Sequence, residues 1–165
     1  MNVLLAMFKG LAYAVYGVIL LCLLIGAPML LGYHSAMVIS GSMEPNYPVG
    51  SITYYKQTAF ENIQEGDVIT FDLGETSLAT HRVVAVNAAD QTFTTKGDAN
   101  ETQDVNPVAY SKVEGKTIGF AIPYAGYFVT YVKSMTVIIP CAAILIIDLL
   151  LTPKDKKKDE NPVPQ

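Results

Sequence analysis

The chain has 165 residues, of which 51% are hydrophobic and only 16% are charged. The hydrophobic share is above, and the charged share below, what a soluble globular domain usually has. The net charge of −4 excludes the basic surface that nucleic acid requires, so we expect no nucleic-acid partner. The two cysteines, Cys22 and Cys141, lie in apolar terminal stretches, which excludes a small disulfide-stapled domain. The composition indicates a protein held in a lipid bilayer, with a modest polar body.

The first apolar stretch covers residues 10–33 and contains no charged residue. A membrane-spanning helix needs about 20 apolar residues, which this stretch supplies. The alternative is a cleavable signal peptide, but its apolar core would be shorter, at about 7–15 residues. We therefore expect residues 1–33 to form an uncleaved N-terminal transmembrane anchor.

A second apolar block covers residues 135–152, is interrupted by Asp148 and ends at a lysine-rich segment. Because cytoplasmic flanks carry an excess of basic residues, this pattern predicts a second transmembrane helix at 134–152 and a polar cytosolic tail at 153–165. The alternative is a buried helix of the polar domain. With two spans, residues 34–133 would lie on the outer face of the membrane.

The middle of the chain has the composition of a β protein. Short runs rich in Val, Ile, Thr, Tyr and Phe alternate with turn residues, at 37–39, 51–55, 68–71, 80–86 and 92–95. We therefore predict a mainly β fold, a small barrel-like or sandwich-like domain at 34–133 that is flanked by the two transmembrane helices.

Few residues of this domain are candidates for metal or cofactor chemistry, and we expect neither a metal nor a cofactor. The loop at 98–104 has oxygen-bearing side chains at alternate positions, as a calcium loop would. The helix-loop-helix calcium pattern, however, requires Gly and Glu where this chain has Gln103 and Ala109. Residues 100–102 match a glycosylation acceptor, but they fall within the candidate catalytic region described next.

Nucleophilic catalysis fits the residues better. A serine hydroxyl needs a neighbouring base to accept its proton, imidazole suits that task, and a carboxylate orients the ring. The domain has Ser40 and Ser42 around a glycine, His81 in a predicted strand, and acids in a polar loop. Taken alone, these residues leave open a structural histidine and ordinary turn serines. We interpret His34 as an interfacial residue without a catalytic role.

Local context makes the interpretation more specific. Residues 40–45 (SGSMEP) resemble the nucleophile box of type I signal peptidases, residues 80–83 (THRV) resemble the box that holds the general base, and residues 96–104 resemble the Gly-Asp loop. A strand-like segment at 119–126 precedes the second apolar block, as in that family. One departure is Ala99, where related sequences often have Asn. Histidine at the base position resembles the endoplasmic-reticulum-type branch, which occurs in eukaryotes, archaea and some Gram-positive bacteria.

The resemblance implies a role for each site residue. Ser42 would be the nucleophile and His81 the general base, while Ser40 would assist the backbone N–H of Ser42 in an oxyanion hole. Asp104 matches the acid that orients the histidine, and Asp98 would then support the loop or the site. The loop offers both aspartates, so Asp98 remains the alternative orienting acid.

The implied function is that of a membrane-bound serine endopeptidase, which removes signal peptides from exported preproteins at the outer face of a bacterial or archaeal cell membrane; an endoplasmic reticulum membrane is the alternative. Two other functions remain open. One is a non-catalytic membrane-anchored adaptor, and the other is a self-cleaving protease in which Lys96 or Lys56 would activate Ser42. The basic side chain nearest to Ser42 distinguishes them. The sequence leaves partner subunits undetermined.

Overall fold

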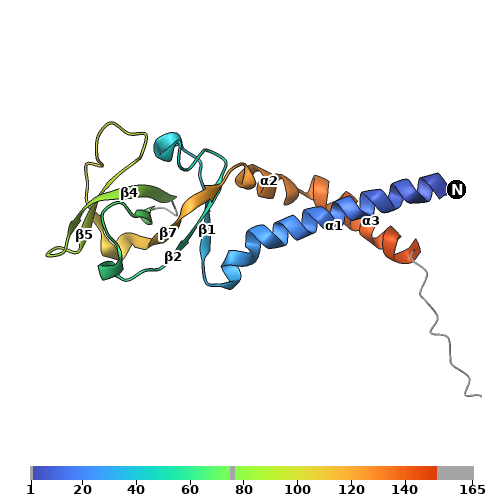
Figure 1. Ribbon diagram of the computed structural model, residues 1–165, viewed down its shortest axis with the longest axis horizontal. Coiled ribbons are helices and arrows are strands. Elements are labelled where there is room, and N and C mark those ends of the chain that lie inside the picture. Colours follow the sequence, from blue (N-terminus) through green and yellow to red (C-terminus); the bar gives the residue numbers. More distant parts are fainter. Residues whose placement is uncertain (1, 75–76, 152–165) are drawn as a thin grey trace, which may run out of the picture. The chain divides into compact units, whose positions relative to one another are not determined.

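The computed structural model describes residues 2–74 and 77–151 (Figure 1). Contacts within the chain divide it into two units. One contains Met1–Leu21 and Lys133–Gln165, and the other contains Cys22–Val132. The tail predicted at 153–165 and the last residue of the predicted second span lie outside the described residues.

The helical unit holds most of α1 (Asn2–Leu30) and all of α3 (Met135–Leu151). Within the described residues, α1 is long and apolar enough from Val3 to Leu30 to cross a membrane. The short helix α2 (Ala125–Val132) and α3 meet the same criterion only when the pair is counted as one broken span. Residues 2–74 and 77–151 therefore contain one N-terminal helix with the length and composition of a membrane span, and a second candidate in the α2–α3 pair.

A hydrogen bond joins α1 to α3 inside the helical unit. Ala12 and Val15 of α1 are buried. The hydroxyl of Tyr16, one residue further along, donates a hydrogen bond of 3.1 Å to the Asp148 carboxylate. Asp148, the acid that interrupts the second apolar block, thus has a hydrogen-bond donor on the other long helix.

The second unit is built on a single sheet (Figure 1). Its strands are β1 (His34–Met37), β2 (Ile52–Lys56), β3 (Val68–Gly74), β4 (Ser77–Asn87), β5 (Thr92–Lys96), β6 (Val108–Ala109) and β7 (Val113–Ile122). The strand order is β1-β2-β7-β3-β4-β5-β6, and every neighbouring pair is antiparallel. Three one-turn 3-10 helices interrupt the loops: η1 (Gly41–Met43), η2 (Phe60–Asn62) and η3 (Tyr110–Lys112).

The mainly β prediction is confirmed for this unit, but a closed barrel or two-layered sandwich is not what the described residues form. They form one seven-stranded sheet in which β1 and β6 are the end strands and do not pair with each other. Closure would require those two ends to form a ladder, and β6 is only two residues long. Strand-by-strand alternation of side chains is similar in open and closed sheets, so the sequence pattern alone did not distinguish them.

The main core supports the strands that carry the candidate site. Its buried members are Ile63, Ile69, Phe71, Val83, Phe93 and Val108. Antiparallel pairing of β3 with β4 sets Ile69 opposite His81 and Phe71 opposite Ala79. Directly paired residues share a face of the sheet, so the histidine emerges from β4 beside core residues of β3. The rings of Phe71 and His81 meet edge to face, with centroids 6.2 Å apart.

Candidate active site

Ser42 lies in the middle of η1, at the end of an extended segment. The next residue, Met43, is buried and anchors this turn in a small cluster with Tyr47 and Val68. The backbone N–H of Ala99 donates a hydrogen bond of 2.9 Å to the carbonyl oxygen of Ser42. Two contacts therefore hold the turn that carries Ser42: Met43 packs in the buried cluster, and the Gly-Asp loop donates a hydrogen bond to the Ser42 carbonyl oxygen.

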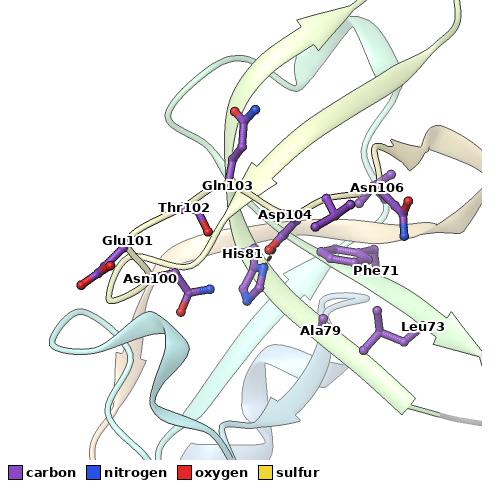
Figure 2. Close-up of a pocket in the computed structure, with 12 residues that line it drawn as sticks. Phe71, Leu73, Ala79, His81, Asn100, Glu101, Thr102, Gln103, Asp104 and Asn106 are labelled. Atoms are coloured by element: carbon purple, nitrogen blue, oxygen red, sulfur yellow. Dashed lines mark hydrogen bonds and ion pairs between the residues drawn. The ribbon is translucent and has the colours of Figure 1, made fainter.

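His81 links the serine to an aspartate. Its Nε2 atom is 3.2 Å from Ser42 Oγ, and its Nδ1 atom is 2.6 Å from Asp104 Oδ2; Figure 2 shows the contact with Asp104. An ionised carboxylate only accepts hydrogen bonds, so Nδ1 carries a hydrogen and donates it to Asp104. In the neutral ring, Nε2 is then the acceptor for the Ser42 hydroxyl. This is the arrangement in which imidazole can take the serine proton.

The position of Asp104 is set by β5. The backbone N–H of Asp104 donates to the carbonyl oxygen of Thr95 at 2.8 Å, and the hydroxyl of Thr95 donates to Asp104 Oδ2 at 2.6 Å. Thr95 is fully buried. The carboxylate oxygen that faces His81 therefore has a second donor, which is buried.

Asp98, the alternative orienting acid, is hydrogen-bonded to Arg82 and not to His81. The Arg82 guanidinium donates two hydrogen bonds to its carboxylate, of 2.7 and 2.6 Å, and the Asn46 amide donates a third of 2.7 Å. The hydrogen bonds from Arg82 lower the pKa of Asp98, against an opposing effect of burial and with a further contribution from Asn46. The same contact raises the pKa of Arg82. The structure thus brings Asp104, and not Asp98, to His81.

The remaining predicted residues are also located. Ser40 Oγ is 3.3 Å from Ser42 Oγ, so the two hydroxyls are adjacent. Lys56 donates instead to the carbonyl oxygen of Leu31 at 3.2 Å, and the ring of His34 stacks on that of Tyr55. Among the described residues, no lysine is hydrogen-bonded to Ser42, and no group of three or more His, Cys, Asp or Glu side chains is arranged to hold a metal ion.

Comparison with known proteins finds similarity to signal peptidases. The chain is 39% identical over 101 residues to signal peptidase I W of Bacillus subtilis (strain 168), which is 59% of this chain and 53% of that protein. Over the matched region the chain is a homologue of type I signal peptidases. It is also 32% identical over 114 residues to the human signal peptidase complex catalytic subunit SEC11C, which is 61% of this chain and 59% of the relative. A third relative is the catalytic subunit SEC11 of Yarrowia lipolytica, 36% identical over 73 residues.

The matches are partial on both sides. The chain spans between half and three fifths of the length of the Bacillus and human signal peptidases. No protein-family model matches it. Similarity to SEC11 proteins as well as to a Bacillus signal peptidase supports the endoplasmic-reticulum-type branch, which the histidine at position 81 predicts.

A groove lies beside Ser42 and is here called the Ser42 groove. It has a volume of about 430 Å³ and lies between residues 36–43 and the beginning of β4, with Tyr47, Leu73 and Asn100 completing the wall. Strand β5 pairs with β4 only from Arg82 onward. Residues 77–81 therefore have no β5 partner along the edge that approaches the Ser42 groove.

Sequence reasoning missed three polar residues of the candidate site: Arg82, Asn46 and Thr95. Arg82 had a usable signal, because it directly follows His81 in a predicted strand and must point to the opposite face. Asn46 and Thr95 had none, since an asparagine near two prolines and a threonine in a strand are both ordinary.

Proposed function

We propose that the chain is a membrane-bound serine endopeptidase that cleaves N-terminal signal peptides from exported preproteins. The observation that carries the proposal is the hydrogen-bonded series from Ser42 Oγ through His81 to Asp104, with separations of 3.2 and 2.6 Å. Ser42 and His81 both line the Ser42 groove. The names of the relatives point to the same reaction.

The proposed reaction is acyl transfer in two steps. His81 Nε2 accepts the Ser42 proton as Oγ attacks the scissile carbonyl carbon, and Asp104 stabilises the charged ring. The C–N bond then breaks, and His81 gives its proton to the leaving amine, which is the new N-terminus of the mature protein. His81 next takes a proton from water, and the hydroxide attacks the ester carbonyl. The signal peptide leaves as a carboxylic acid, and the proton returns to Ser42.

Two groups are candidates for stabilising the oxyanion. One is the backbone N–H of Ser42, in the short helical turn η1, and the other is the hydroxyl of Ser40, which lies 3.3 Å from the Ser42 hydroxyl. Donors held in place before the reaction stabilise developing charge without reorganising, and one such donor contributes about 10²–10³-fold in rate. We assign Ser40 this supporting role.

The substrate is proposed to lie extended in the Ser42 groove. The edge of β4 at 77–81 offers backbone groups for strand-like pairing, while side chains of the peptide enter pockets on the wall. Met43 and Tyr47 line the groove and are themselves buried, and the pocket next to the serine is proposed to be shallow. Small residues before the cleaved bond fit such a pocket.

We propose that the membrane anchor keeps the enzyme close to its precursor substrate. α1 ends at Leu30, and the turn with Ser42 follows shortly after β1. A precursor held in the same bilayer is concentrated near the enzyme, which raises the rate of encounter. We place residues 1–33 in the membrane, 34–133 on the outer face and 134–152 as a second span, in a bacterial or archaeal cell membrane, with a cytosolic tail.

Partner subunits are not needed to complete the proposed site. The human relative is named as a subunit of a complex, whereas Ser42, His81 and Asp104 all come from this one chain. We propose that the purified chain cleaves precursors without further subunits.

The experiment is cleavage of a radiolabelled secretory precursor by the purified full-length chain in phospholipid vesicles. The wild type should release the mature protein, and Ser42→Ala should not. Ser111→Ala, the same change at an exposed serine in η3, is the matched control and should cleave normally. An inactive wild type would favour the adaptor. Loss of cleavage in Lys96→Met but not in His81→Ala would favour a serine-lysine protease.

A further inference from the structure

Helix α2 lies against the segment that forms one wall of the Ser42 groove, and the proposed reaction gives this helix no role. It begins at Ala125, shortly after the end of β7 (Figure 1). Ala125 and Val129, which are one turn apart, pack with Ile52 and Tyr54 of β2. Apolar contacts therefore hold one face of α2 on the sheet.

The wall itself comes from an end strand. Among the described residues, β1 pairs with β2 and with no other strand. The ladder between them ends at Met37, which lies opposite Ile52. Met37 and the next residue, Val38, both line the Ser42 groove. The groove wall therefore lies where regular strand pairing stops.

Backbone hydrogen bonds connect the first turn of α2 to this wall. The N–H of Gly126 donates to the carbonyl oxygen of Gly50 at 2.9 Å, and the N–H of Gly50 donates to the carbonyl oxygen of Val38 at 2.8 Å. The N–H of Val38 donates to the carbonyl oxygen of Ser51, also at 2.9 Å. One residue, Gly50, thus joins α2 to Val38.

Glycines allow α2 to approach the wall so closely. A Cβ added at Gly126 would lie 2.8 Å from the Gly50 carbonyl oxygen and 2.8 Å from Met37 Cγ. Gly50 has a φ of +83°, and a Cβ added there would overlap the ring of Tyr127. One turn further along α2, the Thr130 hydroxyl lies 4.0 Å from Met37 Sδ. Met37 is therefore in contact with two successive turns of α2.

We propose that α2 is a positioning element for substrate binding, which holds residues 37–38 at the distance from β4 that an extended peptide requires. Gly126 and Gly50 do not line the groove and act through Met37 and Val38, which do. A groove wall that is already in place binds a peptide without the cost of ordering it first. This inference rests on the proposed function, because it concerns binding of the same peptide in the same groove.

Gly126→Ala tests the fit of α2 against the wall. The added methyl group must displace Met37 or the Gly50 backbone, whereas the hydrogen bonds of the Ser42 hydroxyl are not touched. In the precursor assay in vesicles, we expect KM to rise by about tenfold, equivalent to one lost hydrogen bond, and kcat to stay within about twofold of the wild type. Gly17→Ala is the matched control, since a Cβ added there meets no described atom within 4 Å, and it should change neither constant.

Val129→Ala weakens the same docking without crowding the wall. It removes two methyl groups from the cluster with Ile52 and Tyr54, so α2 should be held less firmly on the sheet. We expect KM to rise by several fold and kcat to be kept. Val84→Ala makes the same change at an exposed valine of β4 that does not line the groove, and it should leave both constants unchanged.

The outcomes distinguish this inference from the peptidase proposal. An unchanged KM in both α2 variants, with cleavage that still depends on Ser42, would overturn the role of α2 and leave the peptidase proposal standing. A fall in kcat at unchanged KM would place the effect on the catalytic turn and would overturn it as well. If Gly126→Ala does not fold, Val129→Ala decides by the same criterion. Failure of the wild type to cleave would instead count against the peptidase proposal.

Discussion

His81 and Arg82 are neighbours on β4, yet each binds a different aspartate of one loop. His81 Nδ1 is 2.6 Å from Asp104, and Arg82 Nη2 is 2.6 Å from Asp98. Successive side chains of a strand leave on opposite faces, so the loop is fastened on both sides of β4. This double attachment positions the loop that carries both the Asp104 carboxylate and the backbone N–H of Ala99, which donates to the Ser42 carbonyl oxygen.

The two aspartates should differ sharply in their effect on catalysis. Asp104→Asn replaces the carboxylate by an amide, whose NH2 can donate to Nδ1 and select the wrong ring tautomer, so kcat for precursor cleavage should fall by about 10⁴-fold while the variant remains folded. Asp98→Asn should leave the histidine contact intact, lower kcat much less, and reduce thermal stability. Steady-state kinetics and thermal unfolding of both variants check this. A larger loss of kcat in Asp98→Asn would identify Asp98 as the orienting acid.

Arg82→Lys tests the attachment of the loop. The guanidinium makes two hydrogen bonds to Asp98 and a third, of 2.7 Å, to the carbonyl oxygen of Gly66. An ammonium keeps the charge but cannot form this planar, forked arrangement. We expect a loss of about 1–3 kcal/mol in the free energy of unfolding, because the carboxylate is left partly unsatisfied. Denaturant titration measures it, and an unchanged midpoint would contradict the role given to Arg82.

The same ion pair should make stability depend on pH in the acidic range. Contacts with Arg82 lower the pKa of Asp98 in the folded chain below its ordinary value of 3.8. A group whose pKa is lowered by folding stabilises the folded state above its unfolded pKa, and this contribution is lost as pH falls through the folded pKa. The stability difference between the wild type and Asp98→Asn should therefore be constant from about pH 7 to 5 and shrink below about pH 4. A difference that persists in acid would contradict the assignment.

Thr95 is predicted to act as a positioning residue. Its buried hydroxyl donates a hydrogen bond of 2.6 Å to the Asp104 oxygen that faces His81. Thr95→Val keeps the shape and removes the donor, which should lower kcat with little change in KM, because the substrate does not touch this residue. Thr95→Ser, which restores the hydroxyl, should recover most of the activity. Equal kcat in the valine and serine variants would show that only packing matters here.

The identity of the site residues was largely predictable from local sequence, but their partners were not. The serine and histidine boxes identified Ser42 and His81 because each motif is contiguous. The choice between Asp98 and Asp104 depended on which face of β4 each side chain meets. That in turn depends on the path of the loop and on Thr95, which is buried in β5.

The strands of the sheet, too, were only partly predictable from local sequence. Five strands were predicted from runs of β-branched and aromatic residues, whereas β7, which pairs with both β2 and β3, was predicted only from Gly119 onward. Its first half contains Gly115, where an added Cβ would lie 2.4 Å from the carbonyl oxygen of Lys56. A glycine that allows two backbones to approach has the same appearance in a sequence as a glycine in a turn. Tertiary contact, and not local preference, placed this strand in the sheet.

Gly97 gives the most direct test of the link between the Gly-Asp loop and the nucleophile. A Cβ added there would lie 2.6 Å from the carbonyl oxygen of Ser42 and 2.7 Å from the Asn100 amide nitrogen. Real Cβ atoms do not approach a backbone oxygen so closely, so Gly97→Ala must move the turn that carries Ser42. We expect kcat to fall by about 10²-fold, as a displacement of about 1 Å can cause.

Gly41→Ala is the contrasting variant, because it lies directly before Ser42 but has room. Its added Cβ would be 3.7 Å from the nearest atom of Glu44, an ordinary contact. We therefore expect Gly41→Ala to lose far less activity than Gly97→Ala in the same precursor assay. Of these two glycines, only Gly97 lies against the carbonyl oxygen of Ser42. If the two variants lose activity equally, general rigidity of the loops controls the reaction, and the fit of Gly97 against Ser42 does not.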